Sequence, residues 1–71
     1  MRNKELELLL YNYIKEHENN HIDIVDLISA FPSKGANRIL TTLNTLRINK
    51  YIERVNIGMY YYYKTIRDYE D

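Results

Sequence analysis

The first seventeen residues carry an apolar residue at every third or fourth position. The repeating set is Leu6, Leu9, Leu10, Tyr13 and Ile14. Side chains at this spacing share one face of a helix, so the pattern predicts an amphipathic helix from about Asn3 to His17. Asn3 is a suitable N-cap, because its side chain can accept from a free backbone N–H of the first turn.

Two further apolar residues of this helix, Leu8 and Tyr11, are predicted to lie opposite that stripe, beside Lys4 and Lys15. The core of a single domain does not need these two residues, because the stripe already supplies its apolar face. The sequence therefore predicts a homodimer that uses Leu8 and Tyr11 as its contact. The alternative is that they are scattered surface residues of the kind that proteins commonly expose.

A second, shorter helix is predicted after Asn19-Asn20, which favours a turn. Ile22 could form a very short strand, and Asp23 is placed to cap the helix, with Asp26 at its third position. The apolar face of this helix comprises Ile24, Leu27, Ile28 and Phe31. Pro32 ends it and Ser33 is predicted to cap the next helix, which makes a helix-turn-helix candidate.

A third helix is predicted over residues 33–49. Its buried positions are expected to be Ala36, Ile39, Leu40, Leu43 and Leu46. The opposite face is expected to comprise Lys34, Arg38, Thr41 and Thr45, flanked by Asn37 and Thr42. This face has no carboxylate, whereas an ordinary solvent-facing helix surface mixes both signs of charge.

The remaining residues predict a β-hairpin. Residues 51–55 form its first strand, 56–58 its turn and 59–66 its returning strand. The expected fold class is therefore α+β and mostly helical, with three helices followed by a two-stranded hairpin. Residues 1–67 are predicted to form one domain, and 68–71 an acidic tail.

Charge is unevenly distributed along the 71 residues, although it sums to zero. Residues 1–32 hold three basic and six acidic residues, 33–67 hold seven basic and one acidic, and 68–71 hold three acidic. Positive charge gathered on one unit is typical of nucleic-acid binding.

Cysteine is absent and no apolar run approaches a membrane span, so a cytoplasmic protein without disulfides or thiolate-bound metal is expected.

The segment His17-Glu18-Asn19-Asn20-His21 matches the H-E-x-x-H pattern of zinc-dependent hydrolases. That chemistry requires both imidazoles on one continuous helix, and the two asparagines between them favour a helix end. No third ligand is evident. The sequence therefore predicts no metal site, no cofactor and no enzyme, because it also lacks a paired nucleophile and base.

The order of elements, with Ile39, Leu43 and Leu46 followed by Asn49-Lys50-Tyr51-Ile52-Glu53-Arg54, resembles the winged helix-turn-helix superfamily over residues 4–66. The Tyr60–Tyr63 run is weakly similar to the returning wing strand of small PadR-like repressors. Lys50 stands where many members have glycine, so Asn49 or Lys50 must take a positive φ.

The resemblance implies a homodimeric, sequence-specific regulator of transcription that binds double-stranded DNA. Its third helix would enter the major groove, and its hairpin would contact the DNA backbone or minor groove. The residues that it assigns to DNA are Ser33, Lys34, Gly35, Asn37, Arg38, Thr41, Thr42 and Thr45 on the helix, and Arg54 and Lys64 on the hairpin.

Two alternatives remain open. The same fold could serve as a protein-interaction module, or as a single-stranded-DNA-binding accessory of a mobile element. The latter would use hairpin tyrosines, because Tyr60 and Tyr62 share one face of a strand while Tyr61 and Tyr63 share the other. One pair should pack on the helices, and Tyr61 with Tyr63 is the pair expected to stack on bases.

Overall fold

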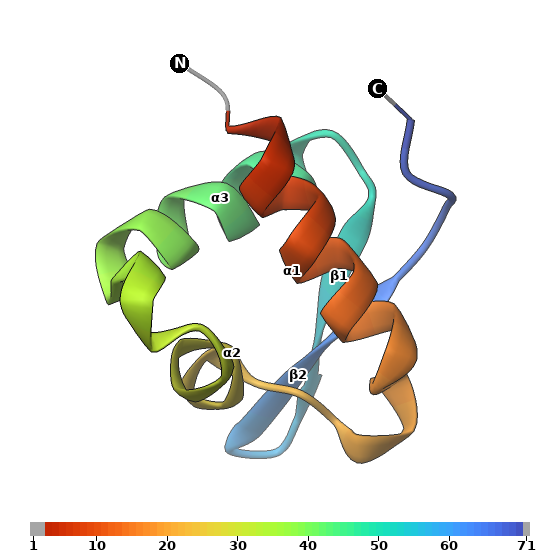
Figure 1. The fold of residues 1–71 in the computed structure, drawn as a ribbon. Helices are drawn as coiled ribbons and strands as arrows, with labels where there is room; N and C mark the ends of the chain where they lie inside the picture. Colours follow the sequence, from red (N-terminus) through yellow and green to blue (C-terminus); the bar gives the residue numbers. More distant parts are fainter. Residues whose placement is uncertain (1–2, 71) are drawn as a thin grey trace.

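Within residues 3–70, which the computed structural model describes, three α-helices precede a two-stranded antiparallel β-hairpin (Figure 1). The elements are α1 (Lys4–Glu16), α2 (Ile24–Ala30), α3 (Ala36–Ile48), β1 (Ile52–Ile57) and β2 (Tyr60–Thr65), with single 3₁₀ turns η1 (Glu18–Asn20) and η2 (Pro32–Lys34). The predicted fold class, a mostly helical α+β chain with a winged-helix-like layout, is confirmed. None of the described helices has the length and apolar character that crossing a membrane requires.

Both predicted N-caps of the first two helices are confirmed. The Asn3 side chain accepts from the backbone N–H of Leu6 at 3.0 Å. Asp23 and Asp26 form a reciprocal capping box, in which each side chain accepts from the other's backbone N–H. These bonds satisfy donors that a helix start leaves without intrahelical partners.

The corner between α2 and α3 differs from the prediction. Pro32 starts η2, and Ser33 lies inside that turn, so it does not cap α3. The N-cap is Gly35, whose φ of 85° lies where glycine is favoured. Because glycine has no side chain, α3 begins without a side-chain cap.

The core lies where α1 and α3 meet the inner face of the hairpin. Its buried residues are Leu6, Leu10, Tyr11, Ile14, Ile22, Leu27, Ile39, Leu43, Leu46, Tyr51, Ile52 and Tyr63. Three residues expected in the core, Leu9, Ala36 and Leu40, are exposed. In their place the fold buries Tyr11, Glu7 and Thr42, so both long helices are rotated from the predicted orientation.

The hairpin turn lies later in the chain than predicted. Ile57 pairs with Tyr60, which leaves Gly58 and Met59 as a two-residue turn, with Gly58 at φ 58°. The turn out of α3 follows the prediction, because Lys50 takes a φ of 65°.

The connection between α1 and α2 is held to β2 by hydrogen bonds that its backbone and a side chain accept. Ile22 forms no strand, but its carbonyl accepts from the N–H of Tyr63 at 2.8 Å. The Glu18 carboxylate accepts from the N–H of Thr65 at 2.7 Å and also from the Thr65 hydroxyl. Hydrogen bonds to an ionised carboxylate are among the stronger ones in proteins.

Because of these bonds, the stability of the fold is expected to depend on pH. The Thr65 side-chain hydrogen bond lowers the pKa of Glu18 below its ordinary value of 4.5, although burial opposes the shift. A carboxyl whose pKa is lowered on folding contributes stability above its unfolded pKa and loses it as pH falls through the folded value. We expect the melting temperature to decrease as the pH drops below about 4.5, and we expect this decrease to be smaller in Glu18→Gln. Thermal melts of both proteins between pH 7 and pH 3 measure the difference, and an unchanged profile in Glu18→Gln would contradict it.

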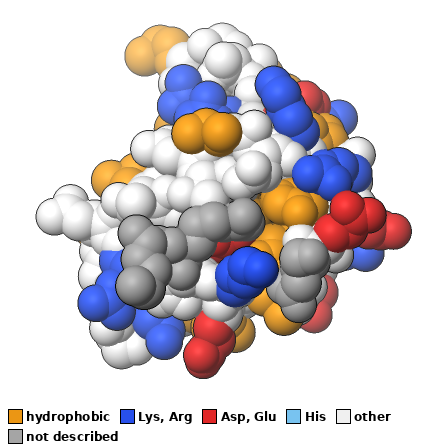
Figure 2. Space-filling model, turned by 90° about the horizontal axis from the view of Figure 1, so that it is seen from above, with side chains coloured by type: hydrophobic (Ala, Val, Ile, Leu, Met, Phe, Trp, Pro, Cys, Tyr) orange, Lys and Arg blue, Asp and Glu red, His pale blue; other side chains and the backbone are white. Residues whose placement is uncertain are grey.

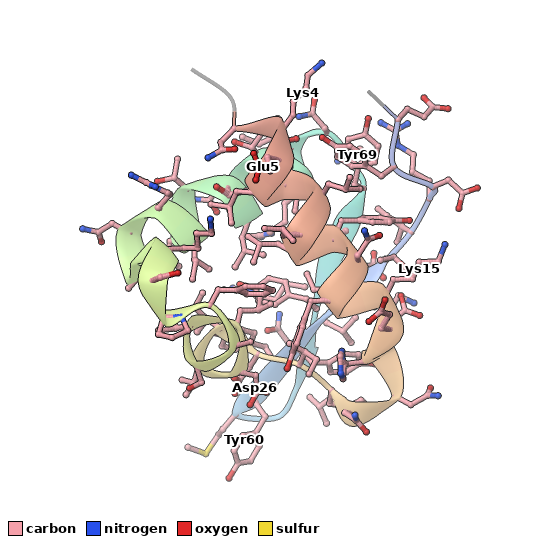
Figure 3. The ribbon with its side chains drawn as sticks, in the orientation of Figure 1. Lys4, Glu5, Lys15, Asp26, Tyr60 and Tyr69 are labelled. Atoms are coloured by element: carbon pink, nitrogen blue, oxygen red, sulfur yellow. The ribbon has the colours of Figure 1, made fainter. Side chains whose placement is uncertain are left out.

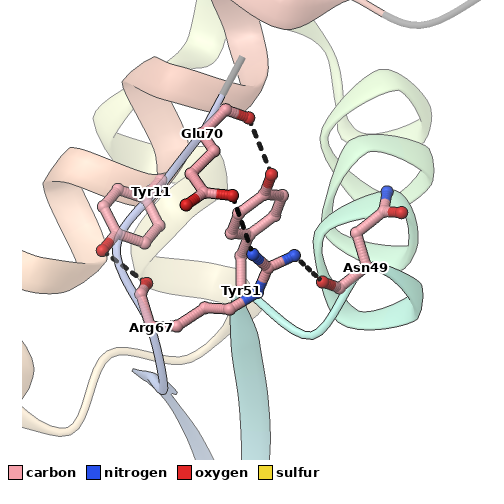
Figure 4. A network of polar contacts seen from close by, with 5 residues as sticks. All are labelled: Tyr11, Asn49, Tyr51, Arg67 and Glu70. Atoms are coloured by element: carbon pink, nitrogen blue, oxygen red, sulfur yellow. Dashed lines mark hydrogen bonds and ion pairs between the residues drawn. The ribbon is translucent and has the colours of Figure 1, made fainter.

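Residues 66–70 fold back onto the domain and do not form a separate tail (Figure 4). Tyr11 donates to the carbonyl of Arg67 at 2.8 Å, and Tyr51 donates to the carbonyl of Glu70 at 2.7 Å. The Arg67 guanidinium lies 4.1 Å from the centre of the Tyr51 ring and donates to the carbonyl of Asn49 at 2.7 Å. Residues 1, 2 and 71 of the predicted domain and tail lie outside the described residues.

Tyr69 completes this packing. Its ring lies 5.7 Å from that of Tyr11 and 4.7 Å from that of Tyr51, measured between centroids, and its hydroxyl donates to Glu7 at 3.0 Å. Tyr11 is therefore 3% exposed, and its assignment to a dimer contact is wrong, because the returning segment 66–70 covers it. Leu8, the other residue of that predicted contact, is 43% exposed.

Candidate nucleic-acid interface

The outward face of α3 carries three polar side chains, together with the exposed apolar residues Leu40 and Ile48. Asn37, Thr41 and Asn44 are exposed and lie opposite the buried Ile39 and Leu46. Asn44 was missed by the sequence prediction, because the predicted orientation of the helix placed it outside the DNA-reading face. The 13 residues of α3 include no carboxylate, so this property of the predicted face survives the rotation.

Two of the predicted DNA-reading threonines are less accessible than expected. Thr42 is 6% exposed and its hydroxyl donates to the carbonyl of Arg38 at 2.8 Å. It packs in the core and is not available to DNA, so that assignment is wrong. Thr45 is half-buried and donates to the carbonyl of Thr41 at 3.2 Å.

The start of α3 gathers the predicted phosphate-binding groups. Lys34 precedes Gly35, and Arg38 is exposed in the first turn. The first N–H groups of a helix have no intrahelical partners and carry the positive end of its dipole. With glycine as the N-cap, backbone can approach an anion there closely. Ser33 is exposed in η2, next to this site.

A groove of about 660 Å³ runs between the start of α1 and α3. Its lining residues are Asn3, Lys4, Glu7, Asn37, Arg38, Thr41, Thr42 and Thr45. Lys4 and Arg38 bring positive charge to it from two different helices. Glu7 is the carboxylate in this lining, and it is 1% exposed with Tyr69 donating to it. The exposed charges of the groove are therefore positive.

The two predicted hairpin contacts, Arg54 and Lys64, lie on opposite faces of the sheet. The register pairs Arg54 with Tyr63 and Glu53 with Lys64, so Arg54 shares the helix-facing side with Tyr63. The guanidinium of Arg54 lies 5.0 Å from the centre of the Tyr61 ring. On the outer face, Lys64 pairs with Glu53 at 3.4 Å. The fold does not bring these two cations together.

A second groove, of about 600 Å³, separates the end of α3 from β1. Arg47, Lys50 and Arg54 supply its positive charge, and Ile48 on its rim is 76% exposed. Burial, with a smaller contribution from the neighbouring Tyr61, raises the pKa of Tyr63 above 10.0, so its phenol stays neutral beside these cations. The sequence prediction had not placed Arg47 in any site.

The tyrosine run is arranged in the opposite sense to the prediction. Tyr61 and Tyr63 pack on the helices, and Tyr60 and Tyr62 form the outer face. Tyr62 stacks on His21, with ring centroids 4.2 Å apart, which leaves Tyr60 as the 81% exposed member of the four. A platform for successive bases on Tyr61 and Tyr63 is therefore excluded.

The two histidines of the H-E-x-x-H segment face different tyrosines. His17 stacks on Tyr13 with centroids 4.1 Å apart, whereas His21 takes a left-handed φ of 52° and stacks on Tyr62. α1 ends at Glu16, so the helix does not continue through the segment, as predicted. Within residues 3–70, no group of three potential ligands is placed to hold a metal ion.

Positive charge is dispersed over one face of the molecule. Figure 2 shows this face from above, with basic side chains separated by hydrophobic, acidic and other groups and not joined into one patch. Comparison with protein-family models, with curated proteins and with solved structures found no match.

Proposed function

We propose that this protein binds double-stranded DNA through α3, as a small sequence-specific regulator of transcription of the winged helix-turn-helix type. The observation that carries the proposal is the exposed face of α3, which presents Asn37, Thr41 and Asn44, has a cation on each side and is free of carboxylates. Repulsion between carboxylates and phosphates would oppose binding, and this face has none.

The side chains on this face suit bases at its centre and phosphates at its ends. An asparagine amide can donate to and accept from adenine at once, and a threonine methyl can contact thymine. Asn37, Thr41 and Asn44 supply these groups along about two turns of helix. Lys34 and the uncapped N–H groups at the start of α3 suit a phosphate.

The cations set how α3 lies on the duplex. Arg38 lies on the α1 side of the helix, and Arg47 lies on the hairpin side, because they line different grooves. The major groove is about 12 Å wide and flanked by both phosphate backbones, so cations on both sides of an inserted helix each have a phosphate to contact. No reaction follows from this arrangement, and the protein acts by occupying its site.

Duplex binding is expected to weaken with salt and to depend on Arg38. Anisotropy titration of a labelled mixed-sequence duplex across a salt series should show affinity falling by about 0.9 log units per phosphate contact for each log unit of salt. We expect Arg38→Ala to weaken binding about tenfold, which corresponds to one contact of about 1.4 kcal/mol.

Lys15→Ala is the matched control, because Lys15 is also basic but lies on the side of α1 away from α3 (Figure 3). Its ion pair with Asp68 is 3.7 Å long and exposed, so its removal should change neither folding nor binding measurably. A single-stranded probe is titrated alongside. No binding at low salt, or tighter binding to the single strand, would contradict the proposal.

A further inference from the structure

β1 presents an open edge to solvent. In an antiparallel pair, alternate residues bond across the ladder, and the residues between them direct their N–H and C=O groups outward. Tyr51 and Ile66 bond across the hairpin, because the Ile66 N–H donates to the Tyr51 carbonyl at 2.9 Å. From this bond, the alternation assigns the backbone N–H and C=O groups of every second residue. Those of Glu53, Val55 and Ile57 point toward β2. Those of Ile52, Arg54 and Asn56 point away from β2.

The two outer edges of the hairpin differ. On β2, the outward N–H of Tyr63 donates to Ile22 and that of Thr65 donates to Glu18, so the connection beyond α1 covers this edge. In the ribbon this connection runs beside β2 (Figure 1). On β1, the outward backbone groups of Arg54 and Asn56 have no hydrogen-bond partner among residues 3–70, and both residues are exposed.

We propose that β1 pairs with β1 of a second copy, antiparallel about a two-fold axis at Val55, to form a four-stranded sheet. An open strand edge is a template for another strand, and natural edges are commonly protected by charged side chains, especially lysine, by proline or by a bulge. β1, with the sequence Ile-Glu-Arg-Val-Asn-Ile, contains no lysine or proline and has a continuous register with β2. Its two charged residues, Glu53 and Arg54, restrict the registers in which it can pair. This dimer does not depend on DNA contact.

Charge selects the register. Only residues with outward backbone groups can bond across the new interface, so these residues must lie opposite one another and the two-fold axis must pass through a residue. The two copies of β1 overlap over most of their length only if that residue is Glu53, Arg54, Val55 or Asn56. An axis at Glu53 or at Arg54 sets two like charges opposite each other, which is destabilising. An axis at Asn56 leaves fewer paired residues. With the axis at Val55, Glu53 lies opposite the second copy's Ile57, and Arg54 lies opposite its Asn56.

This register also aligns apolar and aromatic side chains on the outer face. Val55 pairs with Tyr62 within the hairpin, so the central row across four strands becomes Tyr62, Val55, Val55 and Tyr62. Ile57 is 53% exposed in the single copy and would lie beside Glu53 and Lys64 of the other. Aromatic and β-branched residues in adjacent positions are the favourable cross-strand pairs. Four strands also form a more stable sheet than a lone hairpin.

The test uses the two-fold axis, where a residue meets its own copy. Sedimentation equilibrium over about 1–200 µM should show a monomer–dimer equilibrium for the unmodified chain, with dissociation in the micromolar range. Val55→Lys and Val55→Glu should each weaken the dimer at least about tenfold, because two like charges then face each other. An equimolar mixture of the two variants should restore dimerisation, since lysine then faces glutamate.

Met59→Lys is the matched control. Met59 is 97% exposed in the turn and outside the paired residues, so this variant should dimerise like the unmodified chain. Circular dichroism confirms that each variant is folded before it is compared. The proposal is overturned if the unmodified chain stays monomeric, if both Val55 variants dimerise normally, or if the mixture of folded variants shows no recovery.

Discussion

Replacing Tyr69 by alanine is expected to lower the free energy of unfolding by about 3 kcal/mol, by comparison with other large aromatic truncations. The change removes two ring contacts, with Tyr11 and Tyr51, and one donor to the buried Glu7. A single core in so small a domain rarely supplies more than about 3–5 kcal/mol. The variant should therefore be largely unfolded at 37 °C, which urea denaturation followed by circular dichroism measures.

Two substitutions separate the contributions of Tyr69. Tyr69→Phe keeps the ring contacts and removes only the hydroxyl, so it should lower stability by about 1–2 kcal/mol. Asp68→Ala changes the adjacent residue, whose side chain is 95% exposed, and should change stability by less than about 0.5 kcal/mol. If Tyr69→Ala unfolded at the same urea concentration as Asp68→Ala, the segment 66–70 would not hold the fold as the structure indicates.

The double substitution Lys34→Glu with Arg38→Glu is expected to weaken duplex binding by on the order of 100-fold at low salt, from two contacts of about 1.4 kcal/mol each. Both glutamates would lie near the start of α3, where negative charge is favourable to the helix dipole. Stability should therefore stay unchanged or rise slightly while binding is lost. Anisotropy titration and a thermal melt of the same sample measure the two effects.

Weaker binding together with unchanged or higher stability would show that the loss of binding is not caused by misfolding. A loss of binding through misfolding would lower the melting temperature as well. Lys15→Glu reverses a charge on the other side of α1 and should retain binding within about threefold, because it alters only the long-range field. If Lys15→Glu weakened binding as much as the double variant, net charge and not the start of α3 would govern DNA contact.

Local signals in the sequence were sufficient for the elements of this fold. The spacing of Leu6, Leu10 and Ile14 determined α1, and Asn3 and Asp23 were correctly identified as caps, because a cap bonds within its own first turn. The positive φ of Lys50 followed from the need to turn sharply out of α3. Charge composition was equally local, since α3 lacks carboxylates whichever way it is rotated.

Only the tertiary structure decided which side of each helix is buried. Thr42 and Tyr11 look like surface residues to a periodicity argument, yet Thr42 satisfies its hydroxyl on the Arg38 carbonyl and Tyr11 is covered by residues 66–70. The contacts that settle Tyr11 span 56 or more positions in the chain, and no local pattern encodes them. The same holds for the tyrosine run: alternation predicted two pairs, but only the packing decided that Tyr61 and Tyr63 face the helices while Tyr62 stacks on His21. The sequence by itself therefore determined the elements and the charge of α3, while packing between distant segments determined which side chains are left to meet a partner.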